Sequence, residues 1–387
     1  MFILSIETSC DDTGVAILNA DKRKQETKIL VNLISSQIKI HSPYGGVVPS
    51  LAKREHQKNL VPLLKKSLKR VKMLNPRRGN IPKEKIAQLK QILNREPELL
   101  DALIDFLIKY QKPKINYLSV TVGPGLEPSL WVGINFIKAL GFFWQCPIIP
   151  INHLEGHLFS SFLNDDGRAP IIINQKQFPF LGLIISGGHT ELVQVKGIGK
   201  YKVIGQTRDD AAGEAFDKVA RLLKLEYPGG EKIARLAQGV DLSDVKVSLP
   251  RPMINSTDLD FSFSGLKTAV YYLIKKNPEL VQQKRKIIAA EFQQAVVDVL
   301  IKKTKRALEK DLYKKIILGG GVSANQLLRQ ELVKVFGDKV VFPQLKYCSD
   351  NGAMIALVTW YRLNKFGDKI VKSPQYLRAK GNWEIGK

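Results

Sequence analysis

Two stretches far apart in this chain follow the same pattern: an apolar strand, a short polar turn and a second apolar strand. They span residues 1–18 and 180–195, and a further strand-like stretch follows each of them, at residues 31–40 and 201–207. A supersecondary unit that recurs within one chain indicates repeated domains. We therefore expect a duplicated α/β fold with two lobes, and the cleft between two such lobes is a natural ligand site.

Two of the five histidines, His153 and His157, stand four residues apart directly after the apolar run 146–151. Residues 153–163 read as the helix that leaves this strand, so both imidazoles project from one helix face and can hold one metal ion. Ligand sites collect at the carboxyl ends of strands in α/β folds, which favours a metal site here. The alternative is one packed and one solvated histidine, and the spacing alone leaves it open.

The composition is that of a soluble globular protein. With 387 residues the chain is long enough for two domains, and 44% of its residues are hydrophobic. It contains no run of eighteen apolar residues that could span a membrane, and its first residues do not read as a signal peptide. The three cysteines are widely spaced and form no Cys-x-x-Cys motif, which suits a reducing cytosol. We expect a cytoplasmic protein with no membrane association.

The net charge of +24 favours a polyanionic partner, because each neutralised phosphate releases counterions. The surplus is concentrated in residues 65–114, which hold 14 Lys and Arg against 5 Asp and Glu, a net of +9. Arg77 and Arg78 belong to this basic segment, and residues 99–108 within it read as a helix. The segment is a candidate docking surface for phosphates of such a partner; the alternative is a solvated helix pair that decorates the lobe.

The sequence disfavours two other classes of enzyme, P-loop NTPases and zinc proteases. Glycines follow the strand-like stretch 315–318, where they would let the backbone approach a ligand, but such turns are common. No Gly-x-x-x-x-Gly-Lys-Ser/Thr motif occurs, which disfavours a P-loop NTPase. A zinc protease needs glutamate directly after the first histidine, whereas Glu155 comes two residues after His153 and points about 200° away round the helix. The protease interpretation is therefore disfavoured.

Taken together, these segments resemble the Gcp/TsaD family of tRNA N6-adenosine threonylcarbamoyltransferases in its bacterial form, formerly described as O-sialoglycoprotein endopeptidases. The resemblance is specific because eight motifs occur in family order, although no single one of them would suffice. They are residues 6–13, 44–49, 153–157, 186–190, 209–218, 261–267, 320–325 and 348–353.

The resemblance implies the actin, Hsp70 and sugar-kinase architecture, in which two RNase H-like α/β lobes enclose a cleft. It places the first lobe at residues 1–165 plus about 351–387 and the second at 166–350. Compared with the family, the chain has an insertion at about residues 67–112, which we expect to be a structured helical excursion within the first lobe.

The same resemblance implies that His153, His157 and Asp350 bind one divalent metal ion, iron(II) or zinc. Asp11 and Asp12 are our candidates for a catalytic base, although the family usually has Asp-Glu at this place. Asn152 stands where another histidine is frequent. The residues implied to line the adenylate site are Ile184, Ile185, Ser186, Gly187, Gly188, Asp217, Gly230 and Asn325.

The implied reaction transfers a threonylcarbamoyl group from threonylcarbamoyl-AMP to N6 of adenosine 37 in tRNAs that read codons starting with A. It forms t6A and releases AMP. The implied partners are tRNA, for which the basic segment is a candidate surface, a paralogous subunit and a small ATPase. Two alternatives stay open: a small-molecule carbamoyltransferase or kinase of the same superfamily, and a non-catalytic paralogue that serves as a dimer partner.

Overall fold

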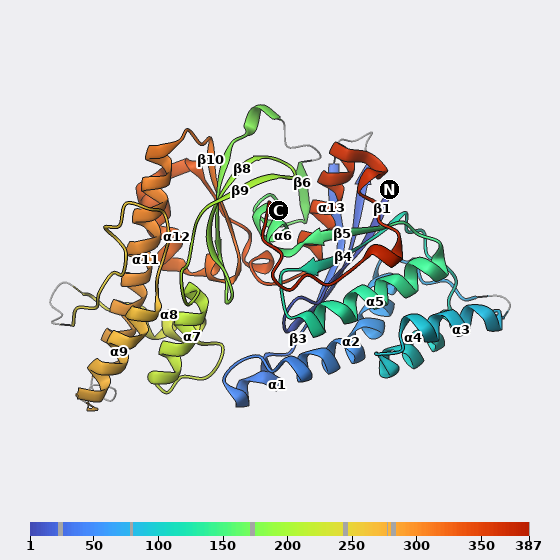
Figure 1. Ribbon diagram of the computed structural model, residues 1–387, viewed down its shortest axis with the longest axis horizontal. Coiled ribbons are helices and arrows are strands. Elements are labelled where there is room, and N and C mark those ends of the chain that lie inside the picture. The colour runs from blue at the N-terminus through green and yellow to red at the C-terminus, as the bar shows by residue number, and fades with distance from the viewer. Residues whose placement is uncertain are drawn as a thin grey trace.

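The computed structural model of the chain forms two α/β lobes that lie side by side (Figure 1). Each lobe is built around one mixed β-sheet. The structure describes residues 1–21, 26–77, 80–170, 175–242, 247–276, 278–279 and 284–386.

The first sheet has the strand order β5-β4-β1-β2-β3-β6. Strands β1, β2 and β3 form an antiparallel meander, and β4 and β5 join it in parallel on the other side of β1. The predicted hairpin at residues 1–18 is formed by β1 and β2. The bounds are Phe2–Glu7 (β1), Asp12–Asp21 (β2), Glu26–Ser36 (β3), Tyr117–Gly123 (β4), Ile148–Asn152 (β5) and Arg168–Pro170 (β6).

The second sheet has the order β11-β10-β7-β8-β9, which repeats the order β5-β4-β1-β2-β3 of the first sheet without a counterpart of β6. Strands β7, β8 and β9 are the antiparallel meander, and β10 and β11 add in parallel beside β7. This matching order confirms the duplication predicted from the two hairpins, and it is the two-lobe architecture of actin and the sugar kinases. The bounds are Phe180–Ile185 (β7), Thr190–Gly197 (β8), Lys200–Gln206 (β9), Lys315–Gly319 (β10) and Val340–Val341 (β11).

Two details differ from the sequence-based expectations. The strand predicted at residues 31–40 is wrong at its end: β3 stops at Ser36, and Ile38–His41 form the short helix α1. The buried side chain of Gln37 donates to the carbonyl of Ala52 and accepts from the side chain of His41, four residues further on. Residues four apart meet on a helix but not on an extended strand, so the chain turns into a helix here. Strand β6 pairs with the start of β3, so residues just after the expected lobe boundary at 165 extend the first sheet.

One face of the first sheet is covered by α2 (Pro49–Arg70) and α5 (Glu127–Trp144). The segment that we expect to be an insertion contains α3 (Lys83–Ile92) and α4 (Pro97–Lys109), which pack against these two helices (Figure 1). The helix predicted at residues 99–108 is therefore confirmed. Its apolar side chains recur every three or four residues and enter the core of the lobe; they are Leu99, Leu103, Phe106 and Leu107.

The helix α4 runs beside α2, and Glu98 of α4 forms an ion pair with Arg54 in the first half of α2 at 3.5 Å. Arg77 has a structural role there: its Nε donates to the carbonyl of Leu107 at 2.7 Å, and its guanidinium lies 5.1 Å from the ring centre of Phe143. Arg78 lies outside the described residues.

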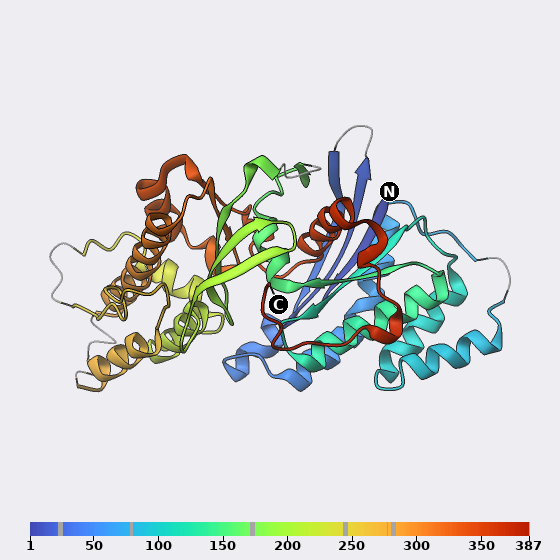
Figure 2. The ribbon, with the colours of Figure 1, turned by 45° about the horizontal axis from the view of Figure 1, so that its top comes forward.

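The centre of the molecule is filled by α6 (His153–Ser160) and α13 (Gly352–Phe366), which lie between the two sheets (Figure 2). None of the helices in the described part of the chain is long and apolar enough to cross a membrane. The outer face of the second sheet carries α7 (Ala212–Leu222), α8 (Gly229–Ala237), α9 (Ser264–Lys276), α11 (Arg285–Lys310) and α12 (Gln326–Phe336).

Candidate functional site

The start of α6 is fixed by Asn152, the last residue of β5. Its side-chain Oδ1 accepts hydrogen bonds from the backbone N–H groups of Leu154 at 2.9 Å and Glu155 at 3.2 Å. Its Nδ2 donates to the carbonyl of Trp383 at 3.2 Å. This N-cap satisfies two free donors of the first helical turn, so the helix begins at His153 directly at the end of the strand.

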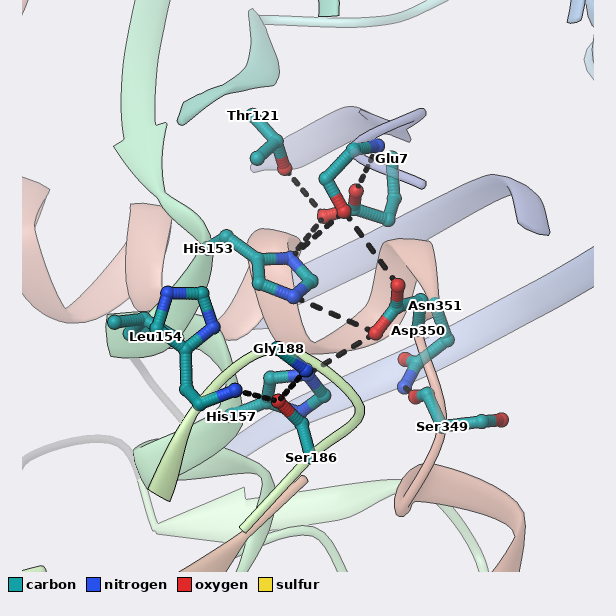
Figure 3. A network of polar contacts seen from close by, with 12 residues as sticks. Glu7, Thr121, His153, Leu154, His157, Ser186, Gly188, Ser349, Asp350 and Asn351 are labelled. Atoms are coloured by element: carbon teal, nitrogen blue, oxygen red, sulfur yellow. Dashed lines mark hydrogen bonds and ion pairs between the residues drawn. The ribbon is translucent and has the colours of Figure 1, made fainter. Parts of the chain in front are cut away.

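His153 and His157 lie on one face of α6 and meet Asp350, which comes from the loop before α13 (Figure 3). The Nε2 atoms of both imidazoles point to the same carboxylate oxygen, Oδ1 of Asp350, at 3.5 Å from His153 and 3.1 Å from His157. One candidate ligand atom from each residue lies within 4.8 Å of the others. Two imidazole nitrogens and one carboxylate oxygen that converge in this way suit iron(II) or zinc, so the residues fit a divalent ion.

A second carboxylate, Glu7 at the end of β1, stands behind His153 (Figure 3). It is fully buried, and its Oε2 lies 3.2 Å from Nδ1 of His153. The same oxygen accepts from Thr121 Oγ1 at 2.5 Å, and Oε1 accepts from the backbone N–H of Ser9 at 2.6 Å. Oε2 also accepts from His153, so Nδ1 carries a proton, and Nε2 is the nitrogen left for a metal, which would displace the proton that Nε2 carries without it.

The charges of this cluster are strongly coupled. Burial disfavours the charged form of His153, but Asp350 and Glu7 outweigh it and raise the pKa of His153 to about 9. Burial and the nearby charge of His153 lower the pKa of His157. Although burial opposes ionisation of Asp350, the two histidines hold the pKa of this carboxyl well below its usual range. Asp350 therefore stays ionised in the middle of the molecule, where its carboxylate can bind a cation.

Two further carboxyls lie near Asp350: Asp11, in the turn after β1, and Asp12, the first residue of β2. Burial, followed by repulsion from Asp350, raises the pKa of Asp11. Burial, Asp350 and Asp11 raise the pKa of Asp12 to about 7. A carboxyl that titrates near neutral pH can exchange a proton with a reacting group, which is what a general base requires.

In the second lobe, the predicted residues Ile184 and Ile185 end β7, and Ser186, Gly187 and Gly188 form the turn to β8. The Oγ of Ser186 accepts from the backbone N–H groups of Gly188 at 3.3 Å and His189 at 3.0 Å, which shapes the turn. A side chain at Gly187 or Gly188 would meet no described atom within 4 Å, so this turn faces open space. It lies close to the metal cluster, as Figure 3 shows.

A second glycine turn lies against the first. Gly320 has a φ of 90°, and a Cβ there would come within 2.4 Å of the carbonyl oxygen of Ile185. Only glycine allows this close approach of the loop after β10 to the end of β7. Asn325 follows this loop and caps α12: its Oδ1 accepts from the N–H of Leu328 at 3.1 Å. Its Nδ2 donates to Gln293 at 2.9 Å, so Asn325 is held in one orientation.

Asp217 lies on α7 and lines a pocket between the lobes. One of its oxygens accepts from the backbone N–H of Gly229 at 2.7 Å, at the start of α8. A Cβ at Gly230 would meet no described atom within 4 Å, so this residue also faces open space. Across the pocket lies the loop of residues 42–45 of the first lobe. Of the predicted substrate residues, Asp217 lines this pocket, and the others lie on the segment 184–188, at Gly230 and at Asn325.

Comparison with known proteins identifies the family. The sequence model of TsaD, described as tRNA N6-adenosine threonylcarbamoyltransferase, matches residues 28–76 and 74–357. A tRNA N6-adenosine threonylcarbamoyltransferase of Nitrosomonas eutropha (strain DSM 101675 / C91 / Nm57) is 42% identical over 389 residues, covering 100% of this chain and 99% of that protein. The chain belongs to the TsaD family.

Solved structures resemble this TsaD family member at much lower identity. Full-length HypF in its phosphate- and nucleotide-bound form is 11% identical, with a TM-score of 0.49 over 95% of this chain and 56% of that one. YeaZ from Pseudomonas aeruginosa is 13% identical, with a TM-score of 0.27 over 52% of this chain and 64% of that one. The fold assignment therefore rests on the strand order of the two sheets.

Glu155, the acid inside the His153–His157 segment, faces away from the metal cluster of this TsaD family member. It is buried and forms an ion pair with Arg362 of α13 at 3.0 Å. It also accepts a hydrogen bond from the hydroxyl of Tyr201 on β9 at 2.5 Å. The side chain therefore links α6 to α13 and to the second lobe, and it cannot serve the metal-bound water that a zinc protease needs.

Three residues of the site were missed by the sequence reasoning: Glu7, Ser9 and His189. Glu7 could have been noticed as the one acid that closes the apolar run of β1. The Oγ of Ser9 lies 3.1 Å from Nδ1 of His153 and 3.5 Å from Asp350. Burial and the charges of His153 and His157 lower the pKa of His189 to about 4, which places its ring in the field of the metal cluster.

Proposed function

We propose that this chain transfers the threonylcarbamoyl group of threonylcarbamoyl-AMP to N6 of adenosine 37 in tRNAs that read codons starting with A. The product is t6A, and AMP is released. The observation that carries this proposal is the identity of 42% to a tRNA N6-adenosine threonylcarbamoyltransferase over the whole chain. The converging His153, His157 and Asp350 support it, because a non-catalytic paralogue would have no need of them.

His153, His157 and Asp350 would hold one divalent ion, iron(II) or zinc, as their donor atoms suggest. When bound, the ion supplies a positive charge that orients the acyl donor and polarises one of its oxygens. Glu7 keeps the ring of His153 in the required tautomer through its hydrogen bond to Nδ1.

The adenylate would lie in the cleft between the lobes, where the glycine turns at 186–188 and 320–321 let the backbone approach a phosphate or a hydroxyl. The residues proposed to contact it are Ile184, Ile185, Ser186, Gly187, Gly188, Asp217, Gly230 and Asn325. Holding donor and acceptor in line supplies much of the acceleration in such a transfer.

In the reaction, N6 of adenosine attacks the carbamoyl carbon and the bond from this carbon to the AMP phosphate oxygen breaks. N6 loses one proton. We assign this proton to a carboxylate oxygen of Asp12 or Asp11, and the pKa of about 7 at Asp12 supports this choice. The electron pair of the broken bond leaves with AMP.

We further propose two lobes at residues 1–165 with 351–387 and at 166–350, with β6 of the second segment extending the sheet of the first lobe. We also propose a cytoplasmic location, in keeping with the tRNA substrate and three free cysteines. A paralogous subunit and a small ATPase would complete the system, and the resemblance to the bacterial form of the family is the support for both partners.

The test uses purified chain, synthetic threonylcarbamoyl-AMP and unmodified tRNA, with the partner proteins added in a second arm. Mass spectrometry of the digested tRNA should detect the threonylcarbamoyl adduct on adenosine 37 in at least one arm. A tRNA in which adenosine 37 is replaced by guanosine is the control. Absence of the adduct in both arms, with metal bound to the protein, would refute the proposal.

A further inference from the structure

A chain of buried polar side chains lies behind the β1–β2 turn and has no part in the mechanism above. Its centre is His56 of α2, whose side chain is fully buried. The Nε2 of His56 lies 2.9 Å from the carbonyl oxygen of Cys10, and its Nδ1 lies 2.7 Å from the hydroxyl of Thr13. These two partners flank Asp11 and Asp12 in the sequence, so one imidazole holds both ends of the segment that carries the two carboxyls.

The hydrogen bonds fix the state of this imidazole. A carbonyl oxygen can only accept, so Nε2 of His56 carries the proton and donates to Cys10. Its Nδ1 therefore accepts, and the hydroxyl of Thr13 donates to it. Burial lowers the pKa of His56 to about 4, so the ring is neutral at physiological pH and keeps this single tautomer.

The chain continues from His56 to α1 through a longer contact, because Thr13 already donates to the one lone pair of Nδ1. The Nε2 of Gln37 lies 3.4 Å from Nδ1 of His56, and its Oε1 accepts from Nε2 of His41 at 3.1 Å. The Nδ1 of His41 then accepts from the backbone N–H of Val48 at 3.3 Å. Both Gln37 and His41 are buried. Val48 thus donates to His41 and His41 to Gln37, so the orientation of the Gln37 amide beside His56 is fixed from α1.

The far end of this chain touches the second lobe. The loop between His41 and Val48 approaches α7 and the segment before α8, which border the cleft. The hydroxyl of Ser42 donates to the carbonyl of Tyr227 at 3.1 Å, and a guanidinium nitrogen of Arg221 donates to the carbonyl of Gly45. The network thus runs from the contact between the lobes to the turn that carries the candidate base.

We propose that His56 is a positioning residue for the transfer reaction: it holds the Cys10–Thr13 turn in place and links it, through Gln37 and His41, to the loop that contacts the second lobe. This inference rests on the proposed function, because it assigns the positioned carboxyls their role. His56 touches neither substrate nor metal in this account. It acts through the placement of Asp11 and Asp12, for which an error of 1 Å lowers a rate by about 100-fold.

Three substitutions of His56 separate its two hydrogen bonds. His56→Gln places an amide nitrogen near the position of Nε2 and can keep the bond to Cys10. His56→Asn places an amide oxygen near Nδ1 and can keep the bond to Thr13. His56→Ala removes both bonds, and Thr13→Val removes one of them from the other side. The matched control is Gln57→Ala on the same helix, because Gln57 is also buried and its Oε1 has no hydrogen-bond partner among the described residues.

The measurements are kcat, KM for threonylcarbamoyl-AMP, bound metal and the thermal midpoint, all on the full-length chain with whatever partners wild-type activity requires. We expect His56→Ala to lower kcat by about 10- to 100-fold, with KM and metal content within about two-fold of wild type. His56→Gln or His56→Asn should restore at least part of this loss. Gln57→Ala should lower the midpoint without lowering kcat.

Hydrogen exchange of the peptide that covers residues 9–13 provides a readout independent of activity. We expect faster exchange in the His56 variants than in Gln57→Ala at an equal loss of thermal midpoint. If exchange and kcat change no more in any His56 variant than in the control, His56 is a filler of the core and the inference is wrong. A wild-type protein without transfer activity would refute the proposed function instead, while the exchange data would still decide whether His56 holds the turn. If His56→Ala does not fold, the two amide variants carry the test.

Discussion

The replacement Glu7→Gln tests whether the buried carboxylate behind His153 prepares the metal centre. Glu7 accepts from three donors: the Oγ1 of Thr121, the backbone N–H of Ser9 and the Nδ1 of His153. Glutamine has the same shape but only one accepting oxygen. If its oxygen takes the place of Oε2, its NH₂ group faces the N–H of Ser9. If its NH₂ group takes that place, Nδ1 of His153 must accept, and the proton moves to Nε2, where it blocks the metal.

Both arrangements are unfavourable, and their cost in stability and in metal affinity can be estimated. Leaving one buried donor without a partner costs about 1–3 kcal/mol of stability. Loss of the group that orients a metal-binding histidine lowers metal affinity by about 10- to 100-fold. That change corresponds to about 1.4–2.8 kcal/mol of binding free energy. We expect the variant to fold, to have a lower thermal midpoint and to bind zinc more weakly by one to two orders of magnitude.

The assay is calorimetric titration of metal-free protein with zinc, supported by measurement of bound metal after dialysis. The control is Glu96→Gln, because Glu96 is equally buried and its Oε2 accepts from Asn135 at 3.1 Å, in the insertion and away from the metal cluster. In this control the amide oxygen can still accept from Asn135, and zinc affinity should stay at the wild-type value. Zinc affinity of Glu7→Gln within two-fold of wild type would refute the argument that Glu7 sets the tautomer of His153.

Three further predictions concern other parts of the molecule. Asp350→Asn should lower both metal content after dialysis and transfer activity, because the histidines lose the oxygen on which they converge; unchanged values would exclude it as a ligand. Glu155→Gln should lower the thermal midpoint, since it leaves the charge of Arg362 without its ion-pair partner. The metal content should not change, and a loss of metal would contradict the geometry described above. Replacing the exposed cations in the second half of α2 with Gln should weaken tRNA binding and flatten the slope of log affinity against log salt, because fewer counterions are released. Binding of threonylcarbamoyl-AMP should not change, and an unchanged slope would exclude this surface. These cations are Lys65, Lys66, Lys69 and Arg70.

Local sequence was sufficient for features that depend on short spacings. The two hairpins could be recognised because alternating apolar strands and a polar turn lie within about twenty residues of each other. His153 and His157 could be paired because residues four apart on any helix share a face. The helix in the insertion could be predicted from Leu99, Leu103 and Phe106, whose spacing gives it one apolar side.

Features that depend on long separations needed the tertiary structure. Asp350 stands 193 residues from His157, and no periodicity connects them. The resemblance to the TsaD family suggested this ligand, and in the folded chain the loop before α13 brings Asp350 to the two histidines. Glu7 and Ser9 could not be recognised as partners of His153, because β1 and α6 become neighbours only when the sheet and the central helices pack together.

The basic insertion illustrates the same division. Its charge and its helices could be read from the sequence, because both are properties of the residues themselves. The role of each cation could not be read from the sequence. Arg77 is bonded to the carbonyl of Leu107 and stacks on Phe143, whereas Lys66 and Lys69 remain exposed on α2. Sequence determines which charges and periodicities a segment has, but only the packing of distant segments determines which of those groups are used internally and which stay exposed to a partner.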